Sequence, residues 1–413
     1  MFDIGTLDQF ADITMGQSPK GTSVSNKGEI PLLNGPTEFG INHPTPVQFT
    51  NDPKRFAKKG DLLFCVRGST TGRMNWSDRD YAIGRGLASI RAKNQYSRYF
   101  IRGSIELFLK ELLQSATGST FPNINKDQLH KMECYLPDER NLKKIDEVLR
   151  NISQKIELNQ KINVTLEEIA KTLFKSWFIN FDPVRAKAEG RPSELSKEIS
   201  DLFPDSFEDC ELGEIPKGWN YRSIYEDLNV IYGAPFSSKM FNSVSKGTPV
   251  IRIRDLKKQQ SDIYTEEVHP KGVLIEKGDV VVGMDGEFRP YLWSGENAWM
   301  NQRICKFAPK HDSSSTFIIE NLRKQLRFIE LTEVATTVIH LGKSDIDEFL
   351  ILNEDRGAIE AFNKICKPIE EKIISNNFEC RKLEEIRDTL LPKLISGELK
   401  ISDAENLVEE AGI

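Results

Sequence analysis

The sequence has few of the residue groups that bind metal ions or form redox sites. Its six cysteines include no C-x-x-C pair, and its five histidines include no H-E-x-x-H motif. We therefore expect no metal site and no redox motif. Long apolar runs are also missing, so we expect no membrane span. The N-terminus lacks the basic segment and apolar stretch of a secretory signal, which predicts a cytoplasmic protein.

Catalytic motifs are missing as well. A DNA methyltransferase needs an Asn/Asp-Pro-Pro-aromatic tetrad and a glycine-rich turn for its methyl donor, and neither occurs. The Gly-Lys-Ser string at 342–344 lacks the upstream glycine of a phosphate-binding loop. Asp279, Asp285 and Glu287 are more typical of solvated turns than of a nuclease centre. We predict no catalytic residue, with a self-contained nuclease or methyltransferase as a minor alternative.

A net positive charge, which a DNA-binding protein is expected to carry, is absent from the chain as a whole. The formal net charge is −6. However, residues 1–136 carry 17 Lys and Arg against 13 Asp and Glu, whereas residues 137–211 carry 12 against 16. Most of the excess acid lies in segments that we assign to helices. This distribution permits local basic surfaces on the globular remainder.

What the sequence does contain is an internal repeat with an offset of about 217 residues. The string Leu-Glu-Glu-Ile at 166–169 recurs at 383–386, and Gly-Asp at 60–61 recurs at 278–279. Each Gly-Asp pair opens an apolar run that predicts a buried strand. Two copies imply two similar globular units related by pseudo-two-fold symmetry.

Single residues extend the repeat. At an offset of 218, Arg85 aligns with Arg303, and Asn34 aligns with Arg252. Arg85 and Arg303 each lie 25 residues after the glycine of the Gly-Asp pair, which suggests a shared role such as a phosphate clamp. The alternative is that each arginine braces a turn.

A coiled-coil pattern follows each globular part. Apolar residues recur at alternating steps of three and four over residues 142–177 and again over 359–394. Each seam spans 35 residues between its ends, or roughly 50 Å at about 1.5 Å per residue. We predict an antiparallel helix pair that packs through Ile152, Ile156, Asn159, Leu166, Ile369, Ile373, Asn376 and Leu383.

Two asparagines occupy equivalent places in the two seams. Asn159 lies near the middle of the first seam and Asn376 near the middle of the second. An antiparallel pair would bring them together, and a buried amide pair fixes the register at a cost in stability. The alternative is that both amides face solvent. Pro368 lies inside the second seam, where it either kinks the helix or marks its start.

Groups that read DNA sequence are concentrated after the first predicted strand. Arginine reads guanine, amides read adenine, and lysine and hydroxyl side chains contact phosphate. Residues 67–73 place two arginines around small hydroxyl residues in a glycine-containing loop. The corresponding loop at 283–289 keeps its glycines and one arginine but otherwise differs. Different loops on a shared scaffold suit two different half-sites.

Two further arginines alternate along a predicted strand. Arg252 and Arg254 are two residues apart, which places both on one face of a strand. The candidate DNA-binding residues are Asn34, Arg67, Ser69, Thr70, Thr71, Arg73, Arg85, Arg252, Arg254, Arg289 and Arg303.

Two strings carry a resemblance to a known family. The first helix closes on Trp-Phe-Ile-Asn-Phe-Asp-Pro-Val at 177–184, and the second globular part opens on Leu-Gly-Glu-Ile-Pro-Lys-Gly-Trp at 212–219. Together with the two-copy organisation, these strings make nearly the whole chain resemble the specificity subunits of type I restriction-modification enzymes.

The expected fold is α+β, with two similar mixed α/β target-recognition domains separated by two long helices that form an antiparallel coiled coil. The expected segments are a first recognition domain (1–141), a first spacer helix (142–180), a connector (181–211), a second recognition domain (212–357), a second spacer helix (358–397) and an acidic tail (398–413).

The resemblance also implies a function. Each domain would read half of an interrupted site in double-stranded DNA, and the helices would set the spacing and bind two methyltransferase subunits. Restriction subunits would join that complex in a prokaryotic cytoplasm. S-adenosylmethionine would belong to the methyltransferase, so this chain would hold no cofactor and catalyse no step. The alternative is a structural coiled-coil scaffold without DNA specificity.

Overall fold

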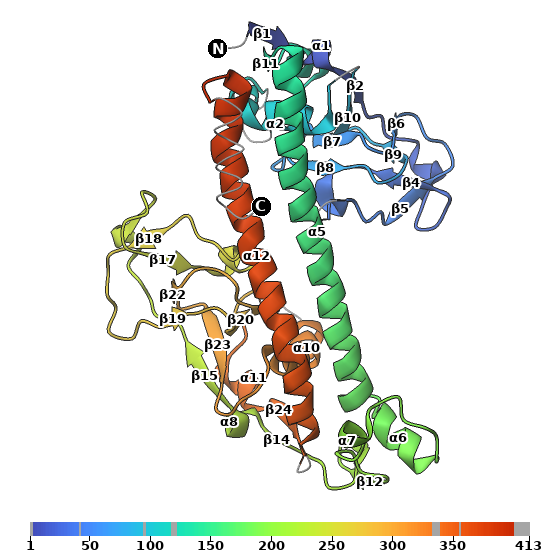
Figure 1. The fold of residues 1–413 in the computed structure, drawn as a ribbon, viewed down its shortest axis with the longest axis vertical. Helices are drawn as coiled ribbons and strands as arrows, with labels where there is room; N and C mark the ends of the chain where they lie inside the picture. The colour runs from blue at the N-terminus through green and yellow to red at the C-terminus, as the bar shows by residue number, and fades with distance from the viewer. Residues whose placement is uncertain are drawn as a thin grey trace. The chain divides into compact units, whose positions relative to one another are not determined.

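The chain divides into two compact units. A computed structural model describes residues 3–40, 43–93, 96–116, 122–332, 339–354 and 357–399 (Figure 1). Unit 1 comprises Met1–Leu158 and Arg381–Ile413, and unit 2 comprises Asn159–Cys380. Two long helices, α5 (Glu139–Phe178) and α12 (Ala358–Ser396), each contribute one part to unit 1 and the other part to unit 2.

Among the described residues, unit 1 forms three sheets. Strands β1 (Asp3–Thr6) and β11 (Glu133–Leu136) form an antiparallel pair. A four-stranded antiparallel sheet has the order β2 (Ala11–Met15), β10 (Leu87–Ala92), β7 (Leu62–Cys65), β8 (Met74–Trp76). A five-stranded sheet has the order β3 (Val24–Ser25), β5 (Gln48–Thr50), β4 (Ile30–Leu33), β9 (Tyr81–Ile83), β6 (Phe56–Ala57), and only its β4–β9 pair is parallel. The short helices of unit 1 are α1 (Leu7–Phe10), η1 (Gly21–Ser23), η2 (Pro36–Glu38), α2 (Arg98–Leu107), α3 (Leu109–Gln114) and α4 (Lys126–His130).

Unit 2 repeats this order strand for strand. The antiparallel pair is β14 (Asn220–Ser223) with β24 (Leu350–Asn353). The four-stranded sheet is β15 (Leu228–Tyr232), β23 (Ile304–Pro309), β20 (Val280–Gly283), β21 (Pro290–Leu292). The five-stranded sheet is β16 (Phe241–Asn242), β18 (Tyr264–Thr265), β17 (Thr248–Ile251), β22 (Ala298–Met300), β19 (Leu274–Ile275), again with one parallel pair, β17–β22. Its helices are α8 (Ile224–Asp227), η3 (Ser238–Met240), α9 (Ile253–Leu256), α10 (Ser315–Thr332) and α11 (Lys343–Asp347). The predicted duplication and the mixed α/β fold class are confirmed.

The Gly-Asp pairs of the repeat form the same turn in both units. Gly60 and Gly278 have φ of 92° and 94°, in the left-handed region that glycine adopts without strain. The carboxylates of Asp61 and Asp279 each accept a hydrogen bond from the backbone amide three residues earlier, at 2.8 and 2.7 Å. Both turns lead into strands whose side chains are all buried, β7 and β20. The predicted buried strands are therefore confirmed.

In unit 2, the C-terminal part of α5 packs against the N-terminal part of α12 in antiparallel orientation. The rings of Phe174 and Phe362 lie 5.9 Å apart, and Asn376 Nδ2 donates to Asn163 Oδ1 at 2.8 Å. Higher residue numbers on α5 thus face lower numbers on α12, as antiparallel pairing requires (Figure 1). Helix α12 continues through Pro368, so this proline lies inside the helix and does not start it. Of the residues predicted to pair the helices, Leu166 and Ile369 are half-buried, and the buried ones are Ile152, Ile156, Asn159, Ile373, Asn376 and Leu383.

The asparagines meet in a different register from the predicted one. Asn376 pairs with Asn163, while Asn159 Nδ2 donates to Glu379 Oε2 at 2.7 Å. The predicted contact of Asn159 with Asn376 is therefore wrong by about one helical turn. Solvent-facing amides are wrong too, because all three asparagines are at most 6% exposed. The counterpart of Asn163 in the repeat is Cys380, which has no amide, so the hydrogen bond between the two amides is not duplicated.

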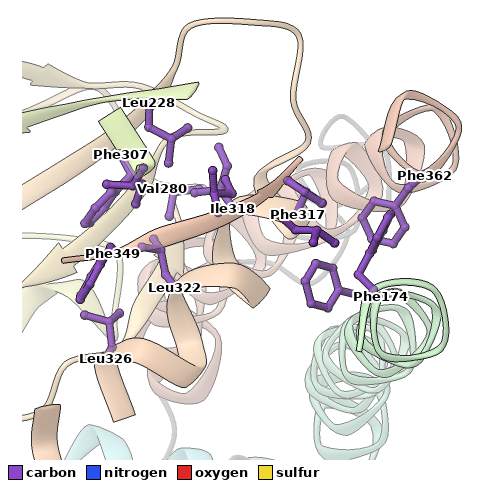
Figure 2. Packing of buried hydrophobic residues seen from close by; sticks show 14 of the residues in the cluster. Phe174, Leu228, Val280, Phe307, Phe317, Ile318, Leu322, Leu326, Phe349 and Phe362 are labelled. Atoms are coloured by element: carbon purple, nitrogen blue, oxygen red, sulfur yellow. The ribbon is translucent and has the colours of Figure 1, made fainter. Parts of the chain in front are cut away.

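The core of unit 2 joins its sheets to its helix segments. Figure 2 shows α10 between the strand residues Val280 and Phe307 on one side and the helix residues Phe174 and Phe362 on the other. The ring of Phe317 on α10 lies 5.8 Å from that of Phe174 and 6.2 Å from that of Phe362. Helix α10 therefore packs between the sheets of unit 2 and the segments of α5 and α12 in that unit.

The two strings that carry the family resemblance meet in one aromatic cluster of unit 2. Trp177 and Phe178 end α5, and Phe181 turns the chain with φ of 57° into α6 (Asp182–Ala188). The ring of Trp219 lies 5.9 Å from that of Phe178, and the ring of Phe203 lies 5.1 Å from that of Trp177. The connector is therefore packed into the core, together with α7 (Lys197–Ser200), β12 (Phe207–Cys210) and β13 (Gly213–Pro216).

Candidate nucleic-acid interface

In unit 1, several chain segments converge where β7 and β10 meet. Val66 N donates to Gly86 O at 2.9 Å, and Ile124 N donates to Val66 O at 2.9 Å. Gly84 N donates to Leu33 O at 2.8 Å. These bonds bring together loop cluster 1, which we define as residues 16–18, 34–35, 67–73, 84–86 and 122–124.

This convergence requires glycine at two of its closest approaches. A Cβ atom on Gly16 would lie 2.2 Å from Gly84 O, and one on Gly86 would lie 2.3 Å from Asn34 O. The atoms in the way are backbone carbonyl oxygens, which cannot move aside as a flexible side chain can. Gly233, which lies 217 residues after Gly16, must also be glycine, because its Cβ would lie 2.1 Å from Asn301 O.

Loop cluster 1 contains every DNA-binding residue predicted in the first half. Arg67 Nε donates to Asn123 Oδ1 at 2.9 Å, and Asn34 Nδ2 donates to Gln48 Oε1 at 2.8 Å. Thr71 Oγ1 lies 2.7 and 2.9 Å from two backbone carbonyl oxygens, so this hydroxyl holds the loop together. Thr70 and Thr71 are half-buried, and the exposed residues are Asn34, Arg67, Ser69, Arg73 and Arg85.

The equivalent segments of unit 2 form a second cluster with the same backbone bonds. Met284 N donates to Arg303 O at 2.9 Å, and Leu341 N donates to Met284 O at 2.8 Å. Gly286 N donates to Ile339 O at 3.1 Å, as Gly68 N does to Pro122 O in unit 1. Loop cluster 2 comprises residues 233–234, 252–254, 284–289, 301–303 and 339–341.

The strand predicted around Arg252 and Arg254 is wrong. Strand β17 ends at Ile251, and helix α9 begins at Ile253. The carboxylate of Asp255 accepts from Arg252 N at 3.0 Å and from Arg252 Nε at 2.7 Å, which favours a helical turn over a continued strand. Arg252 is half-buried in this contact, whereas Arg254, Arg289 and Arg303 are exposed.

Strand register also corrects the predicted equivalence of Arg85 and Arg303. Val66 N bonds to Gly86 O, and its counterpart Met284 N bonds to Arg303 O. Arg303 therefore matches Gly86, and Arg85 matches Gln302. The connection from β20 to β21 is two residues shorter than that from β7 to β8. The following connection, from β21 to β22, is one residue longer than that from β8 to β9. The offset consequently changes from 218 to 217 before the arginines are reached.

The same register identifies Arg73 and Arg289 as equivalents. Each arginine directly precedes a matching strand, β8 in unit 1 and β21 in unit 2. Asn34 and Arg252 are equivalent as predicted, because β4 pairs with β9 as β17 pairs with β22. Both units therefore present an exposed guanidinium group at the same hairpin.

Sequence reasoning missed two residues at the centre of the clusters, Asn123 and His340. Each forms an isolated bridge to the residue that follows the buried strand by two positions, Arg67 in unit 1 and Asp285 in unit 2. Asp285 was considered only as a nuclease carboxylate or turn residue. The spacing across the bridge, 56 residues in unit 1 and 55 in unit 2, was the one available signal.

The bridge in unit 2 carries charged and titratable groups. His340 Nδ1 lies 2.7 Å from Asp285 Oδ1, and Arg303 Nε lies 3.6 Å from Asp285 Oδ2. The side chains of Arg303 and Asp285 are 54% and 30% exposed. A carboxylate, an imidazole and a guanidinium group thus face solvent together at the position where unit 1 has an arginine and an amide.

Buried carboxylates connect the long helices to the helices that support the clusters. Glu370 on α12 accepts from Thr316 N at 2.7 Å and from Ser315 N at 3.2 Å, in the first turn of α10. Burial raises the pKa of Glu370, and these amide donors oppose the rise only in part. In unit 1, Asp146 on α5 accepts from Ser97 Oγ, which caps α2, and burial likewise raises the pKa of Asp146.

Burial also governs the chemistry of the thiols. It raises the pKa of Cys305 to about 12, so this thiol stays protonated at neutral pH. Across the described ranges, no group of three His, Cys, Asp or Glu side chains is placed to hold a metal ion. In the same part of the chain, no helix combines the length and the apolar character needed to cross a membrane.

Comparisons with known proteins agree on one family. The family described as "Type I restriction modification DNA specificity domain" matches residues 2–168 and 216–352. The Type I restriction enzyme HindI specificity subunit of Haemophilus influenzae is 26% identical over 404 residues, covering 84% of this chain and 88% of that protein. The Type I restriction enzyme MjaIX specificity subunit of Methanocaldococcus jannaschii is 29% identical over 368 residues, covering 84% and 80%. The crystal structure of a type I restriction-modification S subunit from M. genitalium has the same fold, with a TM-score of 0.51, 17% identity and 96% of each chain covered.

Proposed function

Because the chain belongs to the type I restriction-modification DNA specificity family, we propose that it is the non-catalytic DNA-reading subunit of such a system. Unit 1 reads one half of a two-part target in double-stranded DNA, and unit 2 reads the other half. The observation that carries this proposal is the repeated strand order with different side chains in equivalent loops. Readers that share a frame but differ in their loops recognise different base sequences.

The loop clusters supply both kinds of contact that sequence-specific binding needs. The exposed guanidinium groups of Arg73 and Arg289 precede matching strands and suit contacts to phosphate, which position a protein on DNA. The side chains at the two bridges differ between the units and suit contacts to base edges. Positioning is therefore common to both units, whereas base selection is specific to each.

The long helices set the distance between the two half-sites. Helix α5 has 40 residues, or about 60 Å at about 1.5 Å per residue. Half-sites on one face of a duplex recur about every 34–36 Å per turn. Two readers linked by helices of this length can bind separate half-sites, so we expect the target to be interrupted by bases that are not read.

The outer faces of the helices support docking of partner subunits. Val164 and Ile169 on α5 are 52% and 50% exposed, and Ile365 on α12 is 37% exposed. Exposed apolar side chains mark a protein interface where they form a contiguous patch, and a docked subunit would bury these ones. Two methyltransferase subunits dock there in the prokaryotic cytoplasm, bind S-adenosylmethionine and methylate adenine. Restriction subunits join that complex, and this chain binds no cofactor of its own.

The test is to express the chain with the methyltransferase subunit of its own system and to map methylated adenines by long-read sequencing. We expect an interrupted motif with two defined parts. Exchanging residues 1–141 for the first domain of a relative should change one part and leave the other intact. A continuous motif, or a change in both parts, would contradict the proposed function, and so would methylation that does not require this chain.

A further inference from the structure

The two bridges occupy the same backbone position in units 1 and 2. Arg67 bridges Asn123, and Asp285 bridges His340. The flanking bonds match as well, since Ile124 N donates to Val66 O at 2.9 Å and Leu341 N donates to Met284 O at 2.8 Å. Two positions with the same backbone bonds therefore carry side chains of opposite charge. Differences in what they bind can then be attributed to the side chains and not to the backbone.

In unit 1 the bridge presents hydrogen-bond donors. Arg67 Nε donates to Asn123 Oδ1 at 2.9 Å, and this bond orients the plane of the guanidinium group. Among the residues that the structure describes, none accepts a hydrogen bond from its two terminal nitrogens. Arg67 is exposed, so this pair of parallel donors faces solvent. Guanine offers the matching pair of acceptors, O6 and N7, in the major groove.

In unit 2 the bridge presents a hydrogen-bond acceptor. Asp285 Oδ1 lies 2.7 Å from His340 Nδ1, which orients the carboxylate as Asn123 orients Arg67. Arg303 Nε, at 3.6 Å from Asp285 Oδ2, lies beyond hydrogen-bond distance. The carboxylate has about four lone-pair sites, so it keeps acceptor capacity toward solvent. The exocyclic amine of cytosine is the base-edge donor that Asp prefers.

We propose that this bridge position discriminates bases in both units, and that its reversed charge makes Arg67 read guanine and Asp285 read cytosine. The inference rests on the proposed function and adds to it the class of base read at one position of each half-site. Each side chain then selects a G·C pair in its own half-site, Arg67 through the guanine and Asp285 through the cytosine. Asn123 and His340 are positioning residues, because they act by orienting the side chain that touches the base.

The decisive variant places the bridge of unit 1 into unit 2. In the chain with Asp285→Arg and His340→Asn, expressed with the methyltransferase subunit, one position in the half-site of unit 2 should change from cytosine to guanine. The half-site of unit 1 should stay the same. The single variant Asp285→Asn removes the charge with little change in volume, and it should lower the preference for cytosine at that position by at least about five-fold.

The matched control is Asp262→Asn, because Asp262 is an exposed acid of unit 2 outside loop cluster 2. It should leave both half-sites unchanged. Thermal unfolding of each variant separates a change in reading from a loss of folding, and the Asp285→Asn variant keeps the test decisive if the double variant does not fold.

The outcomes distinguish the inference from the proposed function. A wild-type complex without an interrupted motif would overturn both. An interrupted wild-type motif whose bases are unaltered by Asp285→Asn and by the double variant would overturn the inference alone. The same holds if only Arg303→Ala, and not Asp285→Asn, alters the base, because Arg303 would then be the reader.

Discussion

The joints between sheets and long helices are built differently in the two units, although the strand order is the same. In unit 2, Phe174 and Phe362 pack ring to ring at 5.9 Å. At an offset of 217 the equivalent residues of unit 1 are Leu391 and Ile145, which are also buried but aliphatic. Both joints exclude water, so the duplicated frame tolerates a change of packing as long as the buried volume is filled.

The loop clusters differ in another way. Their backbone bonds are the same, and Gly16 and Gly233 make the same close approach, but the side chains at the bridge have opposite charge. Buried positions are limited by packing, whereas a solvent-facing side chain on a rigid turn is free to change. If the loop clusters contact DNA as proposed, these side chains are where a duplicated protein can acquire a second specificity without losing its fold.

The largest expected effect tests whether the aromatic joint holds unit 2 together. Phe362→Ala leaves a cavity among Phe174, Phe178 and Phe317 and should destabilise unit 2 by about 3–5 kcal/mol. Hydrogen exchange measured by mass spectrometry reports this for peptides of unit 2 separately. The control is Ile365→Ala, on the same helix but 37% exposed. Equal effects of the two substitutions would show that the aromatic joint does not stabilise unit 2.

The amide pair of the helices should have the next largest effect. Asn163→Leu leaves the buried amide of Asn376 without its acceptor and should cost about 1–3 kcal/mol. Adding Asn376→Leu removes the stranded amide, so the double variant should be more stable than the single one. Thermal unfolding of both variants measures the difference. A double variant that is no more stable than Asn163→Leu would argue against a stabilising hydrogen bond from Asn376 to Asn163.

Arg73 and Arg289 extend the comparison of the loop clusters, because they are equivalent in position and both guanidinium groups are exposed, although Arg289 also pairs with Glu287. If both contact phosphate, Arg73→Ala and Arg289→Ala should each lower the slope of log affinity against log salt by about one and leave the motif unchanged. Binding of the purified complex to its target duplex over a range of salt concentrations measures this slope. Arg79→Ala is the control, since Arg79 is exposed but pairs with Asp78 outside loop cluster 1. A slope changed by only one of the two equivalents would break the equivalence.

The smallest effect concerns pH. Burial raises the pKa of Glu370 in the folded state above its value in the unfolded chain. The ionised carboxylate therefore lowers the free energy of unfolding at a pH above the folded-state pKa. This destabilisation disappears as the pH falls to the pKa of the unfolded chain. Glu370→Gln removes this dependence. Relative to the wild type, the variant should therefore gain stability as the pH rises from 5 to 7.5, which denaturant unfolding at several pH values will measure. A constant difference between the two proteins would show that Glu370 does not titrate in this range.

The sequence alone predicted the frame well, because its signals are periodic or repeated. The 3-4 pattern located α5 and α12, and the Gly-Asp pairs located β7 and β20 at the start of buried strands. The equivalence of Asn34 with Arg252 also followed, because the length changes that separate them from those markers cancel and the offset returns to 218.

The centre of the candidate site could not be predicted in the same way. Arg85 and Arg303 were matched wrongly because two small length changes between short strands shift the register, and three-residue strands leave little pattern to detect the shift. Asn123 and His340 meet their partners 56 and 55 residues away, through a bridge that only the folded chain creates. The helix register failed for a related reason, because Asn159 and Asn163 lie on the same face and periodicity cannot choose between them.

The most direct measurement replaces the second recognition domain with a copy of the first, residues 1–141 in place of 212–357, and maps the methylated motif of the resulting complex. If each globular part reads its own half-site through its own loops, the two parts of the motif become copies of each other in opposite orientations. If the motif keeps two different parts, sequence is not selected by the globular parts, and the account is wrong.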